Sequence, residues 1–341
     1  MPGLASDALA WVVVLTFAAG AVLWPRRRDL ARRVLVGAWG LFALFWLQLV
    51  PHFAFVQKSY VEGIGSVLAV PLCLYAGYVL YDGRDSLVAL SRSVAWMGLL
   101  YLPFETIPSV TVAGTTVPAP RAVLIRLVTG QTYWLMELLG HEPTLVTGDA
   151  GLLNTFKFVT PGGHVILFTL ILACTGLGSI SIFVGLIAAV DAPFRRKLRA
   201  LAVAVPIIYV LNLARTTFIG LAFGKQYMQW FVDEVLFLFG DTDPYMVSFY
   251  LSDRVISQSL AVLALVAVTY LVVRELPELL GIVEDALFLL TRTEYDRAAA
   301  LDLPRPAATD GGRPAGYDGP EAPESSEPSE PAGQSSDGDE D

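Results

Sequence analysis

Residues 170–190 read LILACTGLGSISIFVGLIAAV, residues 191–200 read DAPFRRKLRA and residues 201–215 read LAVAVPIIYVLNLAR. Two apolar segments of about the length that crosses a bilayer therefore flank a turn with four basic residues. Because Lys and Arg are enriched in cytoplasmic loops, the pattern predicts an antiparallel helical hairpin whose turn lies inside the cell. The ends of this hairpin, marked by Cys174 and Arg215, would then return to the outer face of the membrane.

The rest of the chain continues this pattern. Hydrophobic residues make up 55% of the sequence and the mean hydropathy is +0.57, which exceeds what the core of a water-soluble domain requires. Apolar windows of spanning length fall near residues 8–24, 34–56, 61–81, 86–104, 166–190, 200–220 and 255–277. The first window ends in Trp-Pro-Arg-Arg-Arg and not in a small-residue cleavage site, which indicates a retained span. The composition predicts an all-α polytopic membrane protein with about seven transmembrane helices.

Basic residues alternate between consecutive loops along the chain. The loops predicted to be cytoplasmic carry Arg26, Arg27, Arg28, Arg32, Arg33, Arg84, Arg195, Arg196, Lys197, Arg199 and Arg274. The opposite loops hold few basic groups, so the N-terminus is predicted outside and the C-terminal tail inside. The protein is expected in the cell membrane, with its candidate site at the outer face.

Five regions follow from these spans. Residues 1–104 form the first four spans, residues 105–161 form an external loop, and residues 162–280 carry the remaining spans with the candidate site. The external loop contains a helix-length run with Arg121 and Arg126, which is predicted to lie in the interface or on the bundle, or to form an eighth, poorer span.

The end of the chain has a different composition. Residues 281–301 are predicted as a juxtamembrane helix. Residues 302–341 contain 11 acids against Arg305 and Arg313, which accounts for the whole formal charge of −9. A segment so rich in Pro, Gly, Ser and acids cannot bury enough apolar surface to fold, so a disordered cytoplasmic tail is predicted.

Of the two cysteines, Cys174 lies in the more informative setting. It precedes Thr175-Gly176-Leu177-Gly178-Ser179, and the glycines allow the backbone to turn and to approach a neighbour closely. A helix beginning near Thr175 would favour a thiolate at Cys174. The alternative is a buried structural cysteine beside a small-residue helix contact. Cys73 lies within an apolar run, and a disulfide framework is not indicated.

Two arginines complete the candidate site. Arg215 lies in an apolar run, where an arginine costs about 2.5 to 3.5 kcal/mol at mid-helix, unless it snorkels to the headgroups or pairs with Asp253. Arg254 opens the last span and could be an ordinary interfacial anchor. The predicted topology brings Cys174, Arg215 and Arg254 to one face, where two guanidiniums would activate a thiolate and supply donors for an oxyanion. Asn212 would share the helix face of Arg215.

Other kinds of site have weaker support. His164, ten residues before Cys174, is the only near candidate for a general base, whereas His52 and His141 are expected at the interface or in solvent. The metal-ligand spacings and phosphate-binding glycine loops are absent from the sequence, so neither a metal nor a cofactor is predicted. A nucleic-acid partner is not expected either.

Three motifs carry a resemblance to a known family. ACTGLGSISIF surrounds Cys174, LNLAR ends in Arg215, and SDR contains Arg254, in this order and on successive predicted spans. In this respect the chain resembles the exosortase/archaeosortase family, over roughly residues 162–272. The third residue of the family pattern is a histidine in exosortases and an arginine in the archaeosortase type found in halophilic archaea. In this sequence it is Arg254.

The resemblance implies a membrane-embedded cysteine transpeptidase. Substrates of the family are secreted surface proteins, including the surface-layer glycoprotein, with a C-terminal Pro-Gly-Phe signal that is cleaved before the protein is attached to a membrane lipid. By this resemblance Cys174 forms an acyl-thioester, Arg215 is the proton donor and Arg254 stabilises the transition state. Because the pKa of arginine is very high, Arg215 is better described as a charge-assisted hydrogen-bond donor.

Two other classes of protein remain open. An anion or lipid transporter could use Arg215 and Arg254 as binding residues, and Cys174 would then be dispensable. The seven predicted spans, however, show no internal repeat that would support alternating access. In a scaffolding membrane protein the convergence of these three residues would be accidental.

Overall fold

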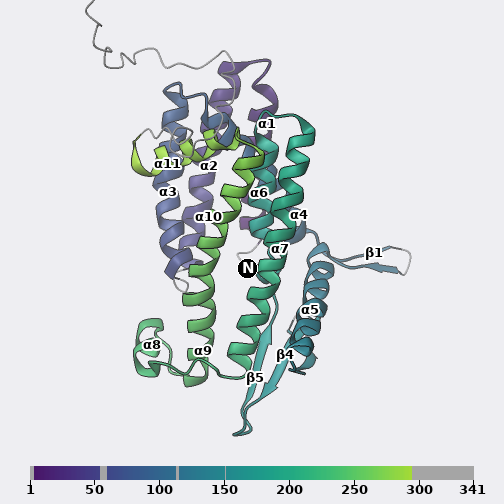
Figure 1. Ribbon diagram of the computed structural model, residues 1–341. Coiled ribbons are helices and arrows are strands. Elements are labelled where there is room, and N and C mark those ends of the chain that lie inside the picture. The colour runs from purple at the N-terminus through teal and green to yellow at the C-terminus, as the bar shows by residue number, and fades with distance from the viewer. Residues whose placement is uncertain (1–3, 54–59, 113–114, 150, 294–341) are drawn as a thin grey trace, which may run out of the picture. The chain divides into compact units, whose positions relative to one another are not determined.

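The computed structural model describes residues 4–53, 60–112, 115–149 and 151–293, and four long helices open the chain (Figure 1). They are α1 (Leu4–Leu23), α2 (Arg28–Pro51), α3 (Tyr60–Tyr81) and α4 (Leu87–Thr106). Helix α2 packs between α1 and α3, and α1 also contacts α4. The largest side chains at the centre of this bundle, Phe17, Leu35 and Leu80, are fully buried.

The second half of the chain adds a longer series of elements. Its helices are α5 (Pro120–Leu138), α6 (Leu177–Ala189), α7 (Phe194–Gly224), α8 (Val232–Phe239), α9 (Val247–Phe249), α10 (Gln258–Glu275) and α11 (Leu279–Thr291). Short 3-10 helices, η2 (Leu172–Thr175) and η3 (Pro244–Met246), precede α6 and α9, and a π-helical segment, η4 (Tyr250–Ser257), joins α9 to α10. Helix α6 packs on α4 and α7, and α7 packs on α10.

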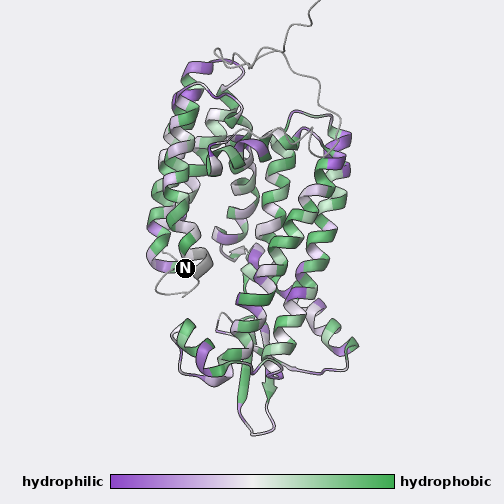
Figure 2. Cartoon of the chain, turned by 60° about the vertical axis from the view of Figure 1, so that its left-hand side comes forward, coloured by the Kyte–Doolittle hydropathy of each residue, from purple (hydrophilic) through white to green (hydrophobic). Residues whose placement is uncertain are grey.

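Membrane-spanning helices dominate the fold. Within the described residues, six segments are long and apolar enough to cross a bilayer: Ala5–Leu23, Arg28–Pro51, Gly63–Tyr81, Leu87–Thr106, Phe194–Gly224 and Pro244–Glu275. Hydrophobic residues cover these helices along most of their length, and hydrophilic residues gather near the helix ends (Figure 2). A helical polytopic membrane protein is therefore confirmed. Helix α5 is not among the six spans, so an eighth span is not supported.

The fifth predicted span, residues 166–190, is wrong in its first half. Only Leu177–Ala189 is α-helical, and with 13 residues it is shorter than the other spans. The residues before it form strand β5 (Val165–Thr169) and η2. The run VILFT is β-branched or aromatic at most positions, which favours a strand, and its polar partner strand lies outside the apolar window.

The fold is mostly helical, as predicted, and two small sheets lie in the segment from 105 to 170. Strands β1 (Val110–Val112) and β2 (Thr115–Val117) form a hairpin, and β3 (Thr144–Thr147), β4 (Leu153–Val159) and β5 form an antiparallel sheet in the order β3-β4-β5.

One face of the larger sheet packs on α5 and α7, with Phe158 and Phe168 in the same core cluster as Met136. Glycines on α7 make this contact possible. A Cβ at Gly224 would lie 2.3 Å from the Phe158 ring, and a Cβ at Gly220 would lie 2.4 Å from Met136.

Ion pairs join the loops at one end of the helices. Arg32 pairs with Asp85 at 2.7 Å, Arg84 with Asp285 at 3.0 Å, Arg92 with Asp191 at 2.8 Å, and Arg196 with Glu278. These contacts gather the basic loops at a common end, as the alternation of charge predicted. Which side of the membrane this end faces stays a prediction.

The remaining predicted regions are only partly within the described residues. Helix α5 lies in the run that was predicted as an interfacial or packed helix, and it contacts α4 and α7. Helix α11 covers much of the predicted juxtamembrane helix at 281–301. The predicted disordered tail, residues 302–341, lies outside the described residues.

Candidate active site

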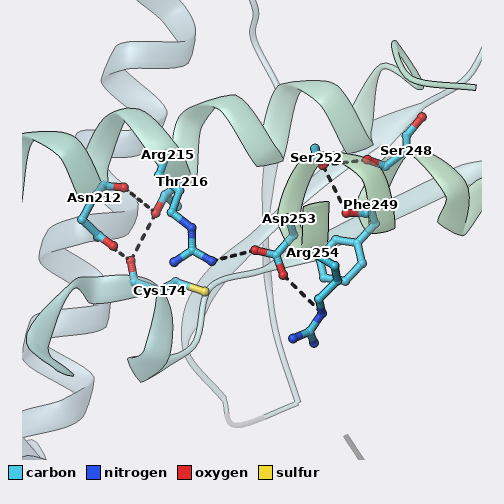
Figure 3. A network of polar contacts seen from close by, with 9 residues as sticks. All are labelled: Cys174, Asn212, Arg215, Thr216, Ser248, Phe249, Ser252, Asp253 and Arg254. Carbon is cyan, nitrogen blue, oxygen red and sulfur yellow. Dashed lines mark hydrogen bonds and ion pairs between the residues drawn. The ribbon is translucent and has the colours of Figure 1, made fainter. Parts of the chain in front are cut away.

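Cys174 lies in η2, between the end of β5 and the start of α6, and its side chain is half-buried. The backbone N–H of Cys174 donates to the carbonyl of Ile171 at 2.9 Å. Its carbonyl oxygen accepts from Asn212 Nδ2 at 2.8 Å and from Thr216 Oγ1 at 3.2 Å, both on α7 (Figure 3). These bonds fix the backbone of the cysteine against α7.

The turn after Cys174 requires a glycine. Gly176 has φ 77°, in the left-handed region, and a Cβ there would lie 3.0 Å from Asn212 Cβ. The prediction of a backbone turn with close approach is confirmed at this residue. Gly178 has open space around it, so packing does not require a glycine there.

The two predicted arginines meet at a carboxylate. Arg215 Nη2 lies 2.7 Å from Asp253 Oδ1, and Arg254 Nε lies 3.5 Å from Asp253 Oδ2. Figure 3 shows the sulfur of Cys174 turned toward this cluster. Arg215 Nε is buried and has no hydrogen-bond partner among the described residues. The structure therefore brings together Cys174, Arg215 and Arg254, and adds Asp253 between the arginines.

The position of Asp253 and Arg254 depends on η4. The π-helical segment runs from Tyr250 to Ser257 and continues directly into α10. Segments of this kind are rare and are frequently found at functional sites. Here both consecutive side chains, Asp253 and Arg254, take part in the same cluster. Sequence patterns contain no signal for this geometry, and they placed Asp253 only as a possible ion-pair partner of Arg215.

The electrostatic environment of the thiol is mixed. Cys174 lies outside the spanning helices, and burial raises the pKa of its thiol. The positive charges of Arg215 and Arg254 oppose this effect, whereas the charge of Asp253 adds to it. Helix α6 begins at Leu177, beyond the predicted start at Thr175. Burial is the largest of these effects, so the pKa of the Cys174 thiol lies above its ordinary value.

The histidines do not join the site. The ring of His164 stacks on Tyr245 with centroids 3.8 Å apart. It lies at the far end of β5, a strand of five residues or about 17 Å, from the end that leads to Cys174. His141 lies near Tyr227, with ring centroids 6.4 Å apart. His164 is thus not placed to act as the base of Cys174.

A groove leads from the site into the spanning helices. It has a volume of about 310 Å³ and lies between α6, α7 and α10. Its polar end is lined by Asn212, Arg215 and Ser257. The rest is lined mainly by apolar residues of α7, beginning at Ile208, and of α10, ending at Val268. Along α10 the lining runs from Leu260 to Val268, a length of about 12 Å. The groove is therefore an elongated apolar space with an arginine at one end.

The fold and the site together define a class of protein: a polytopic helical membrane protein that holds one cysteine beside an arginine–aspartate–arginine cluster. Among the described residues no group of His, Cys, Asp and Glu could hold a metal ion. A family model described as transmembrane exosortase matches residues 4–242. The chain belongs to the transmembrane exosortase family.

Two relatives are similar over most of the chain. One is archaeosortase A of Haloferax volcanii, which is 63% identical over 303 residues, 89% of this chain and 100% of the relative. Another is archaeosortase A of Natronomonas pharaonis, 44% identical over 294 residues, 84% of this chain and 89% of the relative. No solved structure matches. The family resemblance of the sequence motifs is thereby confirmed.

Proposed function

We propose that this protein is a membrane-embedded cysteine transpeptidase that cleaves a C-terminal sorting signal from secreted surface proteins and transfers them to a membrane lipid. The observation that carries the proposal is the contact of Arg215 and Arg254 with Asp253 beside the sulfur of Cys174 (Figure 3). A thiol next to fixed cationic donors is suited to nucleophilic attack on a peptide carbonyl.

In the first step the sulfur of Cys174 bonds to the scissile carbonyl carbon. Arg254 donates a hydrogen bond to the oxygen that becomes negative in the tetrahedral intermediate, and Arg215 supplies a charge-assisted donor near the leaving group. Asp253, which lies between the two arginines, is the carboxylate assigned to accept the thiol proton and to pass it to the leaving amine. The C–N bond breaks and an acyl-thioester remains on Cys174.

In the second step a nucleophilic group of a membrane lipid attacks the thioester carbonyl. The C–S bond breaks, the acyl group moves to the lipid, and the lipid proton returns through Asp253 to the sulfur. The groove between α6, α7 and α10 supports this step, because it ends at Arg215 and is apolar over about 12 Å of its length. A lipid chain in this groove would bring its polar end to the thioester.

The dimensions of α7 support a site at the outer surface. Arg196, in the basic turn, and Arg215 are 19 residues apart on this helix, a distance of about 28 Å. This matches the roughly 30 Å thickness of the hydrocarbon core. With the basic loops in the cytoplasm, Cys174 lies where a substrate anchored by its own transmembrane helix would present its cleavage site.

The names of the relatives, and the resemblance of the three motifs, support a finer proposal for the substrates. These are secreted proteins with a C-terminal Pro-Gly-Phe signal, including the surface-layer glycoprotein. The test is to trap the intermediate: a substrate fusion is incubated with the protein, and a thioester on Cys174 is sought by mass spectrometry. A Cys73→Ala variant should give the same adduct, and a Cys174→Ala variant should give none.

The transporter hypothesis has one observation in its favour, the presence of Arg215 at the end of the groove. The ion pair of Arg215 with Asp253, at 2.7 Å, argues against this hypothesis. The guanidinium that would bind a transported anion is already paired with a carboxylate. Transport would not depend on Cys174, so the behaviour of Cys174→Ala separates the two functions.

A further inference from the structure

We propose that the outer edge of β5 binds the substrate segment that precedes the scissile bond, as an added strand parallel to β5. The proposal rests on the proposed function and names the part of the protein that holds the peptide for it. Neither Cys174 nor the arginines explain how an extended peptide is aligned over the sulfur, and the sheet edge next to them supplies such a guide.

The hydrogen bonds of the sheet show which groups of β5 are available. Thr160 N–H donates to the His164 carbonyl, and Leu170 N–H donates to the Asn154 carbonyl, both at 2.9 Å. Antiparallel pairs alternate between bonded and non-bonded positions, so Ile166 and Phe168 bond to β4. The backbone groups of Val165, Leu167 and Thr169 therefore point away from β4.

The edge to which these groups point is open. Strand β5 is the last in the order β3-β4-β5, and no described strand pairs with its other side. As whole residues, Val165 and Leu167 are 44% and 54% exposed. Exposed edges are usually protected by charged residues or proline, and β5 has neither in the run VILFT. An unprotected edge of this kind is a template for another strand.

The edge leads directly to the nucleophile. Thr169 is the last residue of β5, and Cys174 follows five residues later in η2. Met246 and Phe249 pack against the cluster that contains Phe168. This places η3 and α9 beside the sheet, and Asp253 and Arg254 follow in η4. A peptide paired with β5 would thus run from the tip of the sheet to Cys174.

The direction of the substrate determines the direction of pairing. Strand β5 runs from the β4–β5 turn toward Cys174. In the proposed substrate the folded, secreted part precedes the cleavage site and the membrane helix follows it. The peptide must therefore also run toward Cys174, which makes it parallel to β5.

Binding by strand addition has a useful chemical consequence. Main-chain hydrogen bonds supply affinity without requiring particular side chains, and specificity is confined to alternate residues. Such an edge suits an enzyme that processes several surface proteins with different sequences before the signal. The alternative is that this apolar edge lies in the lipid headgroup region, with the side chains of Val165 and Leu167 inserted there. The test below distinguishes this alternative from peptide binding.

The test compares two substitutions at one edge residue. Leu167→Pro removes an N–H that points to the open edge and leaves the bonds to β4 in place. Leu167→Ala keeps the N–H and removes most of the side chain. At matched protein levels we expect Leu167→Pro to process a substrate fusion about five- to tenfold more slowly than Leu167→Ala, because only the proline removes the N–H.

Equal rates for Leu167→Pro and Leu167→Ala would overturn the proposal. An equal loss in both would assign the effect to the side chain, as insertion into headgroups predicts. If Cys174→Ala abolishes processing while Leu167→Pro leaves it unchanged, the proposed function stands and the edge does not bind the substrate.

A second measurement does not depend on the folding of a variant. Proline is placed in turn at successive residues before the cleavage site of the substrate fusion, and processing is followed with the wild-type protein. Strand pairing predicts that sensitivity alternates with a period of two residues. Uniform tolerance, or a loss without periodicity, would contradict the added strand.

Discussion

Replacing Asp253 by Asn tests the role of the carboxylate that joins the two arginines. The substitution keeps the size of the side chain and removes its charge and its capacity to accept a proton. Asp253 lies 2.7 Å from Arg215 and 3.5 Å from Arg254. We therefore expect two separate effects, one on stability and one on the rate of processing.

The cost in stability can be bounded from the exposure of the pair. The side chain of Asp253 is 13% exposed and that of Arg215 is 34% exposed. Removing one partner of a fully buried pair costs about 3–5 kcal/mol, whereas an exposed pair contributes about 0–1 kcal/mol. For this intermediate case we expect a loss of about 2 kcal/mol, which leaves most of the protein folded when the total stability is typical.

The effect on rate should be larger. Loss of a positioned acid or base lowers a rate by about 10²–10⁴-fold, so Asp253→Asn should process a substrate fusion at least about 100-fold more slowly. The assay is the gel shift of the fusion at matched protein levels, with thermal unfolding of the purified protein in detergent measured in parallel.

A matched control is available at the other end of the helices. Asp285 pairs with Arg84 at 3.0 Å and its side chain is 4% exposed, so Asp285→Asn also removes a buried, paired carboxylate. It should lower stability and leave the processing rate of the folded protein unchanged. If Asp253→Asn reduces processing only in proportion to the loss of folded protein, Asp253 has a structural role and the proposed proton path is wrong.

Three further predictions concern neighbouring features. Arg215→Lys should lose most of the processing rate in the gel-shift assay, because an ammonium cannot reproduce a planar, forked donor; wild-type rates would contradict this. Gly176→Ala should lower the thermal unfolding temperature, since φ 77° and the contact with Asn212 oppose a side chain, and an unchanged temperature would disprove the strain. A single cysteine placed at Arg196, in a background with both Cys73→Ala and Cys174→Ala, should resist an impermeant thiol reagent in intact cells, whereas one at Gly130 should react; labelling at Arg196 would reverse the topology.

Much of the fold was predictable because hydropathy is a local property. The helices α1 to α4, α7 and α10 each fill an apolar window with basic residues in alternate loops. The same alternation is enough to bring Cys174, Arg215 and Arg254 to one end of the helices. The site could therefore be assembled from the sequence without knowledge of any contact between helices.

The strand β5 was missed because VILFT and the following LILAC form one continuous apolar run. A buried strand and a buried helix cannot be separated by periodicity in such a run. What decides the matter is the pairing of β5 with β4, which is a contact between segments that lie apart in the sequence. Thr216 was missed for a similar reason, since its bond to the Cys174 carbonyl depends on how α7 packs against η2.

The bridging role of Asp253 could not be predicted either. Asp253 and Arg254 are neighbours in the π-helical segment η4, and the 3.5 Å contact between their side chains depends on side-chain conformation, which no periodicity in the sequence encodes. The sequence identified Arg215 by its unusual position in an apolar run and Arg254 by its predicted place on the same face, but it contained no indication that one carboxylate would join them.

The most direct test of the central claim is the processing of a substrate fusion by the Cys174→Ala protein in cells that lack the wild-type copy. The substitution removes the only atom proposed to form the thioester, and it leaves intact the carbonyl of residue 174 that Asn212 and Thr216 bind. The account predicts that the protein reaches the membrane at normal levels and that the fusion remains entirely unprocessed, with Cys73→Ala behaving as the wild-type protein does. Normal processing by the Cys174→Ala protein would contradict the assignment of Cys174 as the nucleophile and would favour a transporter.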